Sequence, residues 1–438
     1  MPAIIGDAAL LSAFAHLEQY PTAALAVSGG PDSLALMHLA RRWIALTGRR
    51  TASMAVVTVD HQLRPESESE AAFVARRAEQ VGFPHAVLKW TGRKPETGIQ
   101  AAARSERYRL LTAYCHEKGL ACLVTAHTED DQAETLLMRL RRGSGLDGLA
   151  AMAPLSEQHG LPIVRPLLRL SKGRLTAYLR ANGLPFVHDS SNENTAFERV
   201  RLRHAMKALA AAGIARPALA KSALRLGRSR NALAILTDDF LRGHFHVTVL
   251  GRGELQQVAI NALPPDLALR AIGQMLALVG GTQDPPRLSK LESLLPRLAS
   301  DRLETTLGRC LIVARRGTLY FYREPGRLKP APVLVERGGM YVWDGRYLLT
   351  FASDPPCGAI VRQLGPDGWL VYRKAMKLKN ILAQVDRLAA LSTPALWIGN
   401  SLVCTPSLGF ANDELVPVPP PPLAAQFLPQ LARFLNPI

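Results

Sequence analysis

The sequence predicts an α/β protein with three parts: an N-terminal domain built on a parallel sheet, a mainly helical middle domain and a small α+β C-terminal domain. Short apolar runs alternate with helical patterns over the first part of the chain, as in βαβ units. Longer helical patterns separated by prolines follow, and short strand-like runs dominate the end. A chain of 438 residues has room for about three domains. We expect them at residues 1–215, 216–325 and 333–438.

The first predicted strand and helix enclose a glycine-rich loop. Residues 23–27 have the length of a buried parallel strand, and apolar residues recur at helical spacing from Leu34 to Trp43. Glycines let the backbone approach a ligand closely, and the free N–H groups at the helix start attract anions. The loop therefore predicts a phosphate site formed by Ser28, Gly29, Gly30, Pro31, Asp32 and Ser33.

Asp32 makes this loop more specific than a serine-rich helix cap, which is the structural alternative. A carboxylate in an anion-binding loop is unfavourable unless a cation such as Mg²⁺ lies between it and the phosphates. The pattern differs from the Walker loop, which needs Gly-Lys-Ser/Thr, and from the dinucleotide loop Gly-x-Gly-x-x-Gly. We therefore expect a nucleotide site of another kind.

Three further strands are predicted, a buried one at residues 52–59, a shorter one at 85–90 and a fourth at 121–126. Helices are predicted at 67–81, at 99–118 and from Glu129 onward. In a parallel sheet of this type, ligands bind beyond the carboxyl ends of the strands. Polar segments that follow such ends should converge on one crevice. These segments are Ser28–Ser33, Asp60–Arg64 and His127–Glu134.

The helix start after His127 carries clustered carboxylates. Thr128 can cap this helix, and acidic residues suit a first turn, which explains one or two of them without any function. Asp130 and Asp131 both share a helix face with Glu134. Carboxylates this close repel one another unless a cation lies among them. Either Mg²⁺ or a substrate ammonium would supply that cation.

The formal net charge is +17 and the sequence pI is about 10.1. A polyanion such as RNA is the simplest partner, and a generally basic surface is the alternative. Residues 199–230 contain no Asp or Glu, which favours a phosphate-binding face over a linker helix. A second basic cluster lies near the C-terminus. The candidate RNA contacts are Arg199, Arg201, Lys207, Arg225 and Arg228 in the first region, and Arg373, Lys374, Lys377 and Lys379 in the second.

The cysteines and the apolar runs indicate the cellular location of the protein. Five scattered cysteines without metal-ligand spacing indicate a reducing compartment. We see neither a signal peptide nor an apolar run long enough to span a membrane, so a cytoplasmic protein is expected.

The C-terminal part of the chain is predicted to be rich in strands. Short strands are predicted at residues 339–343, 347–351, 370–372, 395–398 and 401–405.

Taken together, these blocks resemble the tRNA(Ile)-lysidine synthetase family, within the superfamily of PP-loop ATP pyrophosphatases. The matching blocks occur in order at residues 28–33, 60–64, 102–108, 127–135, 142–149, 165–168 and 189–203. The chain departs from the family at Val200, where the family usually has asparagine. It also lacks the arginine-rich approach to Thr393 that the family pattern would have.

The resemblance implies an adenine nucleotide alpha hydrolase-like fold and an ATP-dependent ligase. Enzymes of the family join L-lysine to C2 of the wobble cytidine of the isoleucine tRNA that bears a CAU anticodon. ATP first adenylates the C2 oxygen and releases pyrophosphate. The lysine amine then attacks C2, and AMP leaves. The product changes the identity of the tRNA from methionine to isoleucine.

The resemblance also implies roles for single residues. Ser28 to Ser33 would hold the pyrophosphate, with His61 and Arg107 nearby at the ATP. Asp131 and Glu134 would bind the substrate lysine and accept its proton. Two carboxylates are candidates for Mg²⁺ and three arginines for the charge at the α-phosphate. These are Asp32 and Asp130 for the metal, and Arg104, Arg107 and Arg203 for the phosphate. A homodimer stays open.

Three other functions compete with this interpretation. A PP-loop tRNA thiolase would need a catalytic cysteine pair, and Cys115 and Cys122 lack the C-x-x-C spacing. Amidotransferase-type synthetases would have no use for the basic middle domain. A non-catalytic RNA-binding protein with a remnant loop has no need of Asp32, Asp131 and Glu134. RNA-dependent release of AMP from ATP separates the enzymes from the binder.

Overall fold

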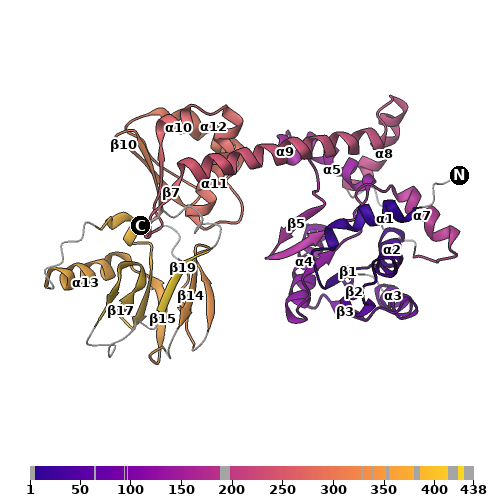
Figure 1. The fold of residues 1–438 in the computed structure, drawn as a ribbon, viewed down its shortest axis with the longest axis horizontal. Coiled ribbons are helices and arrows are strands. Elements are labelled where there is room, and N and C mark those ends of the chain that lie inside the picture. The colour runs from indigo at the N-terminus through magenta and orange to yellow at the C-terminus, as the bar shows by residue number, and fades with distance from the viewer. Residues whose placement is uncertain are drawn as a thin grey trace. The chain divides into compact units, whose positions relative to one another are not determined.

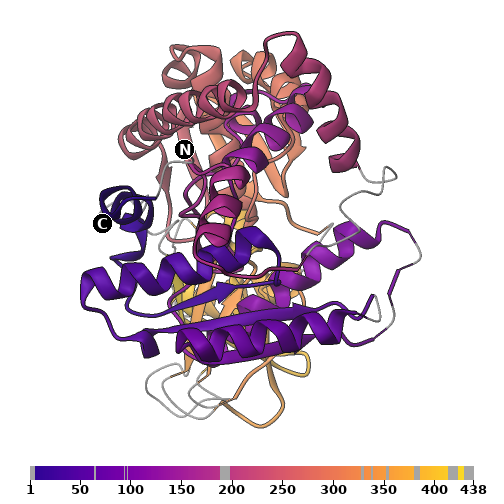
Figure 2. The same ribbon diagram turned by 90° about the vertical axis from the view of Figure 1, so that its right-hand side faces the viewer.

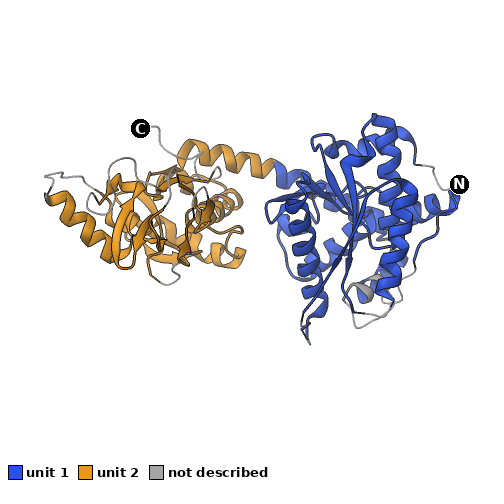
Figure 3. Ribbon diagram, turned by 90° about the horizontal axis from the view of Figure 1, so that it is seen from below, with its two compact units in different colours: residues 1–231 blue, residues 232–438 orange. Residues whose placement is uncertain are grey.

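The computed structural model describes residues 5–63, 66–92, 94–95, 97–187, 198–326, 330–336, 339–351, 355–378, 385–412 and 423–428. The chain forms two compact units, residues 1–231 and residues 232–438, drawn in different colours in Figure 3. The three domain boundaries expected from the sequence stay a prediction. Within the described residues, no helix is both long and apolar enough to cross a membrane.

A six-stranded sheet forms the centre of the first unit (Figure 1). Its strands have the order β3-β2-β1-β4-β6-β5. The first five strands in this order run parallel, and β5 pairs antiparallel with β6 at the edge. All four predicted parallel strands are therefore confirmed. The strands are β1 (Ala23–Ala26), β2 (Met54–Asp60), β3 (His85–Lys89), β4 (Cys122–Val124), β5 (Leu155–Gln158) and β6 (Leu161–Val164).

Helices cover both faces of this sheet (Figure 1 and Figure 2). One face packs against α1, α2, α3 and α7, with Leu36, Trp43 and Leu175 in a common core. The other face packs against α4 through Tyr108 and Leu111. The helices are α1 (Asp7–Phe14), α2 (Pro31–Thr47), α3 (Ser67–Val81), α4 (Ile99–Glu117), α5 (Glu129–Arg141), α6 (Leu146–Leu149), α7 (Lys172–Ala181) and α8 (Glu198–Ala211). The long helix α9 (Arg216–His244) begins in the first unit and ends in the second.

The second unit begins with a five-stranded antiparallel sheet, in the order β7-β8-β11-β10-β9. Residues 310–315 and 318–323 form an antiparallel pair within it, and the helical patterns expected in this part of the chain are present. Its strands are β7 (His246–Val247), β8 (Gly253–Gln256), β9 (Glu304–Leu307), β10 (Cys310–Arg315) and β11 (Thr318–Arg323). Its helices are α10 (Gln257–Asn261), α11 (Pro265–Gly280) and α12 (Leu288–Leu294).

The rest of the second unit is rich in strands, as predicted. One sheet has the order β12-β15-β16-β17-β18 and another the order β13-β14-β19. The strands are β12 (Val333–Leu334), β13 (Met340–Trp343), β14 (Tyr347–Phe351), β15 (Ala359–Gln363), β16 (Pro394–Ile398), β17 (Ser401–Thr405), β18 (Phe410–Ala411) and β19 (Leu423–Phe427). The helices are α13 (Gly365–Leu378) and the short α14 (Arg387–Ala390).

The strand predicted at residues 370–372 is wrong, because this run lies inside α13. Trp369 and Tyr372 are buried three residues apart while Leu370 is exposed, which is the spacing of a helix face. A run of three apolar residues is too short to distinguish the two periods. Arg373, Lys374 and Lys377 accordingly lie in the second half of α13.

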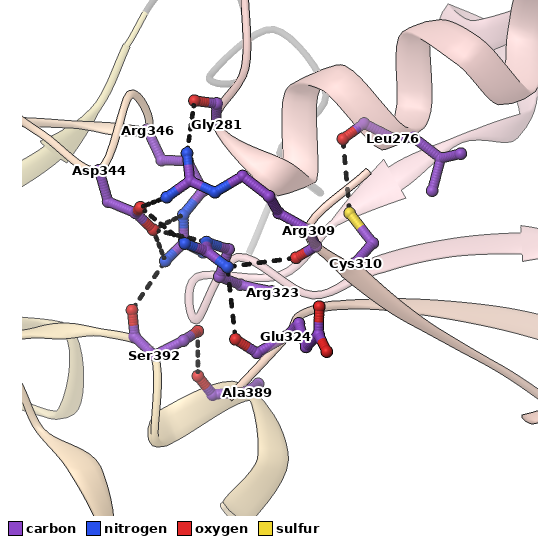
Figure 4. A network of polar contacts seen from close by, with 10 residues as sticks. All are labelled: Leu276, Gly281, Arg309, Cys310, Arg323, Glu324, Asp344, Arg346, Ala389 and Ser392. Carbon is purple, nitrogen blue, oxygen red and sulfur yellow. Dashed lines mark hydrogen bonds and ion pairs between the residues drawn. The ribbon is translucent and has the colours of Figure 1, made fainter. Parts of the chain in front are cut away.

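A buried ion cluster joins the strands of the second unit (Figure 4). Asp344, in the turn between β13 and β14, accepts hydrogen bonds from Arg309, Arg323 and Arg346 at 2.8–3.1 Å. The Asp344 and Arg346 side chains are fully buried, and Arg323 is 2% exposed. Arg346 also donates to the Ser392 carbonyl at 2.7 Å. The single carboxylate therefore links the β13–β14 turn to the β9–β10 turn and to β11, and Arg346 extends the cluster to the α14–β16 connection.

Candidate active site

A cavity of about 850 Å³ opens at the carboxyl ends of β1, β2 and β4. Its wall is formed by the loop before α2, the residues after β2, one face of α4 and the starts of α5 and α7. The convergence predicted for the three polar segments is confirmed for the residues that line the cavity. These are Ser28, Gly30, Pro31, Asp32, Ser33, Asp60, His61, Leu63, His127, Asp130 and Glu134. Arg64 lies outside the described residues.

The loop after β1 has the geometry of an anion site. Gly29 has a φ of +86°, a left-handed conformation that favours glycine. Gly30 is the N-cap of α2, and Pro31 lies in the first turn. A backbone N–H at this position would have no acceptor within the helix, so the N–H that proline lacks costs nothing there. The Ser33 hydroxyl accepts the Ser28 N–H at 3.1 Å and donates to the Gly30 carbonyl at 3.0 Å. These bonds hold the loop over the positive end of α2.

The carboxylate of Asp32 lies partly buried in the first turn of α2. Its Oδ1 is buried and makes no hydrogen bond within the described part of the chain. Its Oδ2 lies 3.7 Å from Lys172 Nζ. Burial raises the pKa of Asp32 to about 6, although Lys172 acts in the opposite direction. A buried carboxylate oxygen without a donor is a fitting ligand for a hard cation such as Mg²⁺.

Asp131 caps its own helix. Its Oδ2 accepts the Thr128 N–H at 2.9 Å and the Thr128 hydroxyl at 2.8 Å, while the Asp131 N–H donates to that hydroxyl, which forms a capping box. Its Oδ1 accepts Lys172 Nζ at 3.0 Å. Burial raises the pKa of Asp131, but Lys172 and the Thr128 backbone outweigh burial and bring that pKa below its ordinary value. The structural explanation of the acidic helix start thus applies to Asp131, which does not line the cavity.

Asp130 is also engaged by the chain itself. Its Oδ1 accepts Arg216 Nη1 at 3.1 Å, and its Oδ2 accepts the Lys172 backbone N–H at 2.8 Å. Both oxygens therefore have a donor. Glu134 is buried and lines the cavity one turn further along α5. Of the three carboxylates on this helix face, Glu134 and Asp130 are at the cavity wall.

Two histidines stand at the strand ends as predicted. His127 lies 2.9 Å from Thr125 Oγ1 through its Nδ1, and burial lowers the pKa of His127 to about 3. Burial also lowers the pKa of His61, whose ring meets Trp90 edge-on at 6.0 Å. Both rings are therefore neutral at pH 7. A neutral imidazole suits positioning by hydrogen bonds better than charge stabilisation.

The positive side of the cavity comes from α4. Arg104 and Arg107 both line it, and their guanidinium groups lie 5.2 and 5.6 Å from the centre of the Tyr108 ring. The aromatic face holds both cations toward the cavity. The side chain of Arg203, the third predicted arginine, lies outside what the structure describes, as does that of Arg199.

The remaining predicted RNA contacts lie on helix surfaces. Arg201 and Lys207 are exposed on α8, and Arg225 and Arg228 are exposed on α9 together with Lys221, at the spacing of one face. In the second unit, three basic side chains of α13 are exposed, whereas Lys379 lies outside the described residues. The three are Arg373, Lys374 and Lys377.

Sequence reasoning missed Lys172 and Arg216. Ser171 accepts the Arg174 N–H as the N-cap of α7, so a local helix start signal was present. No local signal pairs Lys172 with Asp131, because the two are 41 positions apart. The expected cation among the carboxylates is therefore supplied at least in part by the chain itself.

Comparison with known proteins assigns the chain to a family. The PP-loop domain family matches residues 8–209. The tRNA(Ile)-lysidine synthase of Bradyrhizobium sp. (strain BTAi1) is 45% identical over 331 residues, which cover 72% of this chain and 91% of the relative. This chain belongs to the tRNA(Ile)-lysidine synthase family. The synthase of Ruegeria pomeroyi is 39% identical and covers 89% of both chains. That of Wolbachia pipientis wMel is 33% identical and covers 78% of this chain and 79% of its own.

Proposed function

We propose that this protein ligates L-lysine to C2 of the wobble cytidine of the isoleucine tRNA with a CAU anticodon, using ATP and passing through an adenylated cytidine. One observation carries the proposal. In a member of this family, a single cavity brings together an anion-binding loop, an acidic helix face and two arginines of α4. These are the groups that a nucleotide, an amine and a developing phosphate charge require.

ATP binding is supported by the loop before α2. Its backbone N–H groups and the helix dipole would hold the β- and γ-phosphates, which leave together as pyrophosphate. Arg104 and Arg107, which also line the cavity, would stabilise the charge at the α-phosphate while the C2 oxygen attacks. His61, at the end of β2, would help to orient the nucleotide.

Of the two carboxylates expected to bind Mg²⁺, Asp32 fits the ion better than Asp130. Oδ1 of Asp32 is buried without a hydrogen-bond donor, whereas both oxygens of Asp130 accept donors from the chain. No three His, Cys, Asp or Glu side chains in the described ranges gather to hold a metal ion. Asp32 would therefore share Mg²⁺ with the phosphates of ATP, where the ion would neutralise charge on the leaving pyrophosphate. The metal role expected for Asp130 stays a prediction.

Glu134 and Asp131 are proposed to receive the substrate lysine. Glu134 faces the cavity and can hold the ammonium or accept its proton, since only the neutral amine attacks C2. Asp131 already accepts three hydrogen bonds, so one acceptor position remains at its Oδ1. Asp131 would therefore bind the substrate ammonium through the oxygen that also accepts Lys172 Nζ.

The exposed basic side chains of α8, α9 and α13 would hold the tRNA, and the unpaired anticodon base would enter the cavity. A tRNA substrate also favours a cytoplasmic location. A homodimer stays a prediction. The thiolase alternative is disfavoured by the cysteines. Burial raises the pKa of Cys115 to about 11 and that of Cys122 to about 12, so neither is a thiolate at pH 7.

The test is incorporation of labelled L-lysine into the isoleucine tRNA with a CAU anticodon, in the presence of ATP and Mg²⁺. The elongator methionine tRNA, which has the same anticodon, is the control. The proposal expects label in the isoleucine tRNA alone, with AMP and pyrophosphate as products. Release of AMP without lysine incorporation would reject lysine as the nucleophile, and the absence of both from folded protein would reject the enzyme.

A further inference from the structure

Lys172 is a cation that lies between the two halves of the cavity. It is the first residue of α7, and its backbone N–H is fixed on Asp130 Oδ2 at 2.8 Å. Its ammonium lies 3.0 Å from Asp131 Oδ1 on α5 and 3.7 Å from Asp32 Oδ2 in the loop before α2. One side chain thus reaches both the expected amine side and the expected phosphate side.

The ammonium also has donors to spare. An ammonium group has three N–H donors. Within the described residues, Lys172 Nζ makes one hydrogen bond, to Asp131, while its contact with Asp32 exceeds hydrogen-bond length. Lys172 lines the cavity together with Ser28, Gly30 and Ser33. A phosphate held over the α2 start would therefore lie within reach of the remaining N–H groups.

We propose that Lys172 is a phosphate-binding residue of the ATP site, aimed at the leaving pyrophosphate, and that Asp131 positions it. The assignment rests on the proposed function and adds a residue from α7 to the loop and the α4 arginines. The packing of Leu175 and Leu179 against the α2 core fixes the helix that carries Lys172. Asp131 then holds the ammonium in place at 3.0 Å, so that its orientation is set before the phosphates bind.

A phosphate-binding role of Lys172 and a purely structural one predict different effects when the ammonium is removed. A structural role would use the ammonium only to neutralise Asp32 and Asp131. In that case its loss would disturb the acidic side, and the affinity for the substrate lysine would change. A phosphate-binding role predicts that ATP binding and the first half-reaction suffer instead.

The experiment compares Lys172→Met, Lys172→Arg and the matched control Arg180→Met, which removes an exposed charge from the same helix. ATP affinity is measured directly by equilibrium binding, with inorganic pyrophosphate as a second probe. Pyrophosphate release is measured without lysine, and the KM for lysine is measured in the complete reaction. Thermal unfolding checks that each variant is folded.

For Lys172→Met we expect ATP and pyrophosphate affinity to fall about 10- to 100-fold, which is the range for one charged hydrogen bond. Pyrophosphate release should slow at least as much, while the KM for lysine changes less than about 2-fold. Lys172→Arg should recover part of the loss, and Arg180→Met should behave as the unaltered protein.

Unchanged ATP and pyrophosphate affinity in Lys172→Met would overturn the assignment, whatever happened to the KM for lysine. If Lys172→Met does not fold, Lys172→Arg and Lys172→Gln carry the same comparison. Direct binding of ATP and pyrophosphate does not require tRNA. A failure of the proposed lysine ligation would therefore leave this test readable.

Discussion

Lys172 Nζ lies 3.0 Å from Asp131 Oδ1, so the acidic start of α5 is neutralised by a cation from the start of α7. Burial acts against the charge of Lys172, but Asp131, Asp32 and Glu134 outweigh it and raise the pKa of Lys172 above its ordinary value. The ammonium is therefore charged at pH 7. The negative charge of the clustered carboxylates is therefore balanced in part by Lys172 and not by a bound ligand alone.

Replacing Asp32 should change the metal dependence of the reaction. In Asp32→Asn we expect pyrophosphate release to fall about 100-fold or more and the half-saturating Mg²⁺ concentration to rise, because the buried Oδ1 loses its charge. The measurement is a titration with Mg²⁺ at saturating ATP. Asp130→Asn is the matched comparison, since its oxygens are occupied by Arg216 and Lys172. A shift in Mg²⁺ requirement for Asp130→Asn alone would move the metal to Asp130.

His127 should make the stability of the protein depend on pH. The unfolded His127 binds a proton below about pH 6.5, whereas burial keeps the folded ring neutral down to about pH 3. Stability is therefore lost as the pH falls through this window, by about 2 kcal/mol of unfolding free energy between pH 7 and pH 5. Urea unfolding of His127→Gln should show a loss smaller by about that amount. The exposed His16→Gln is the control, and an equal pH dependence in both variants would contradict the assignment.

Removing the carboxylate at Asp344 should destabilise the second unit. Asp344→Asn takes away the negative charge that three guanidinium groups share, two of them almost fully buried. A broken buried ion pair costs about 3–5 kcal/mol, so the thermal unfolding midpoint should fall by several degrees. Asp266→Asn, which changes the exposed partner of a helical pair with Arg270, should stay within about 0.5 kcal/mol of the unaltered protein. Equal midpoints for the two variants would show that Asp344 does not hold the unit together.

The basic face of α9 should contribute to tRNA affinity in a salt-dependent way. In the double variant Arg225→Ala with Arg228→Ala, we expect weaker binding and a log–log salt slope reduced by about 2, because each arginine would neutralise one phosphate. Filter binding at several salt concentrations measures both. Arg242→Ala is the control, because Arg242 pairs with Asp238 near the end of the same helix. The same reduction in the control would point to a general effect of net charge.

Local signals in the sequence were enough for the parallel sheet and for the loop. The strands β1, β2 and β4 are short, mostly buried apolar runs, while β3 is a partly exposed strand at the sheet edge. Gly29, Gly30 and Pro31 mark a turn into a helix by properties of the backbone itself. The acidic helix start was found by the same reasoning, including the Thr128 cap that the structure contains. Where the local pattern was short, as at residues 370–372, the prediction failed.

The four strands β1 to β4 with the helices between them, the phosphate-type loop and the carboxylates beside it could all be predicted from the sequence alone. These follow from periodicity, glycine positions and capping, which act between near neighbours in the chain. Only the tertiary structure decided that Lys172 lies between Asp32 and Asp131, that Arg216 occupies Asp130 and that three arginines share Asp344. These pairs join residues far apart in sequence, and their distances depend on how whole helices and strands pack.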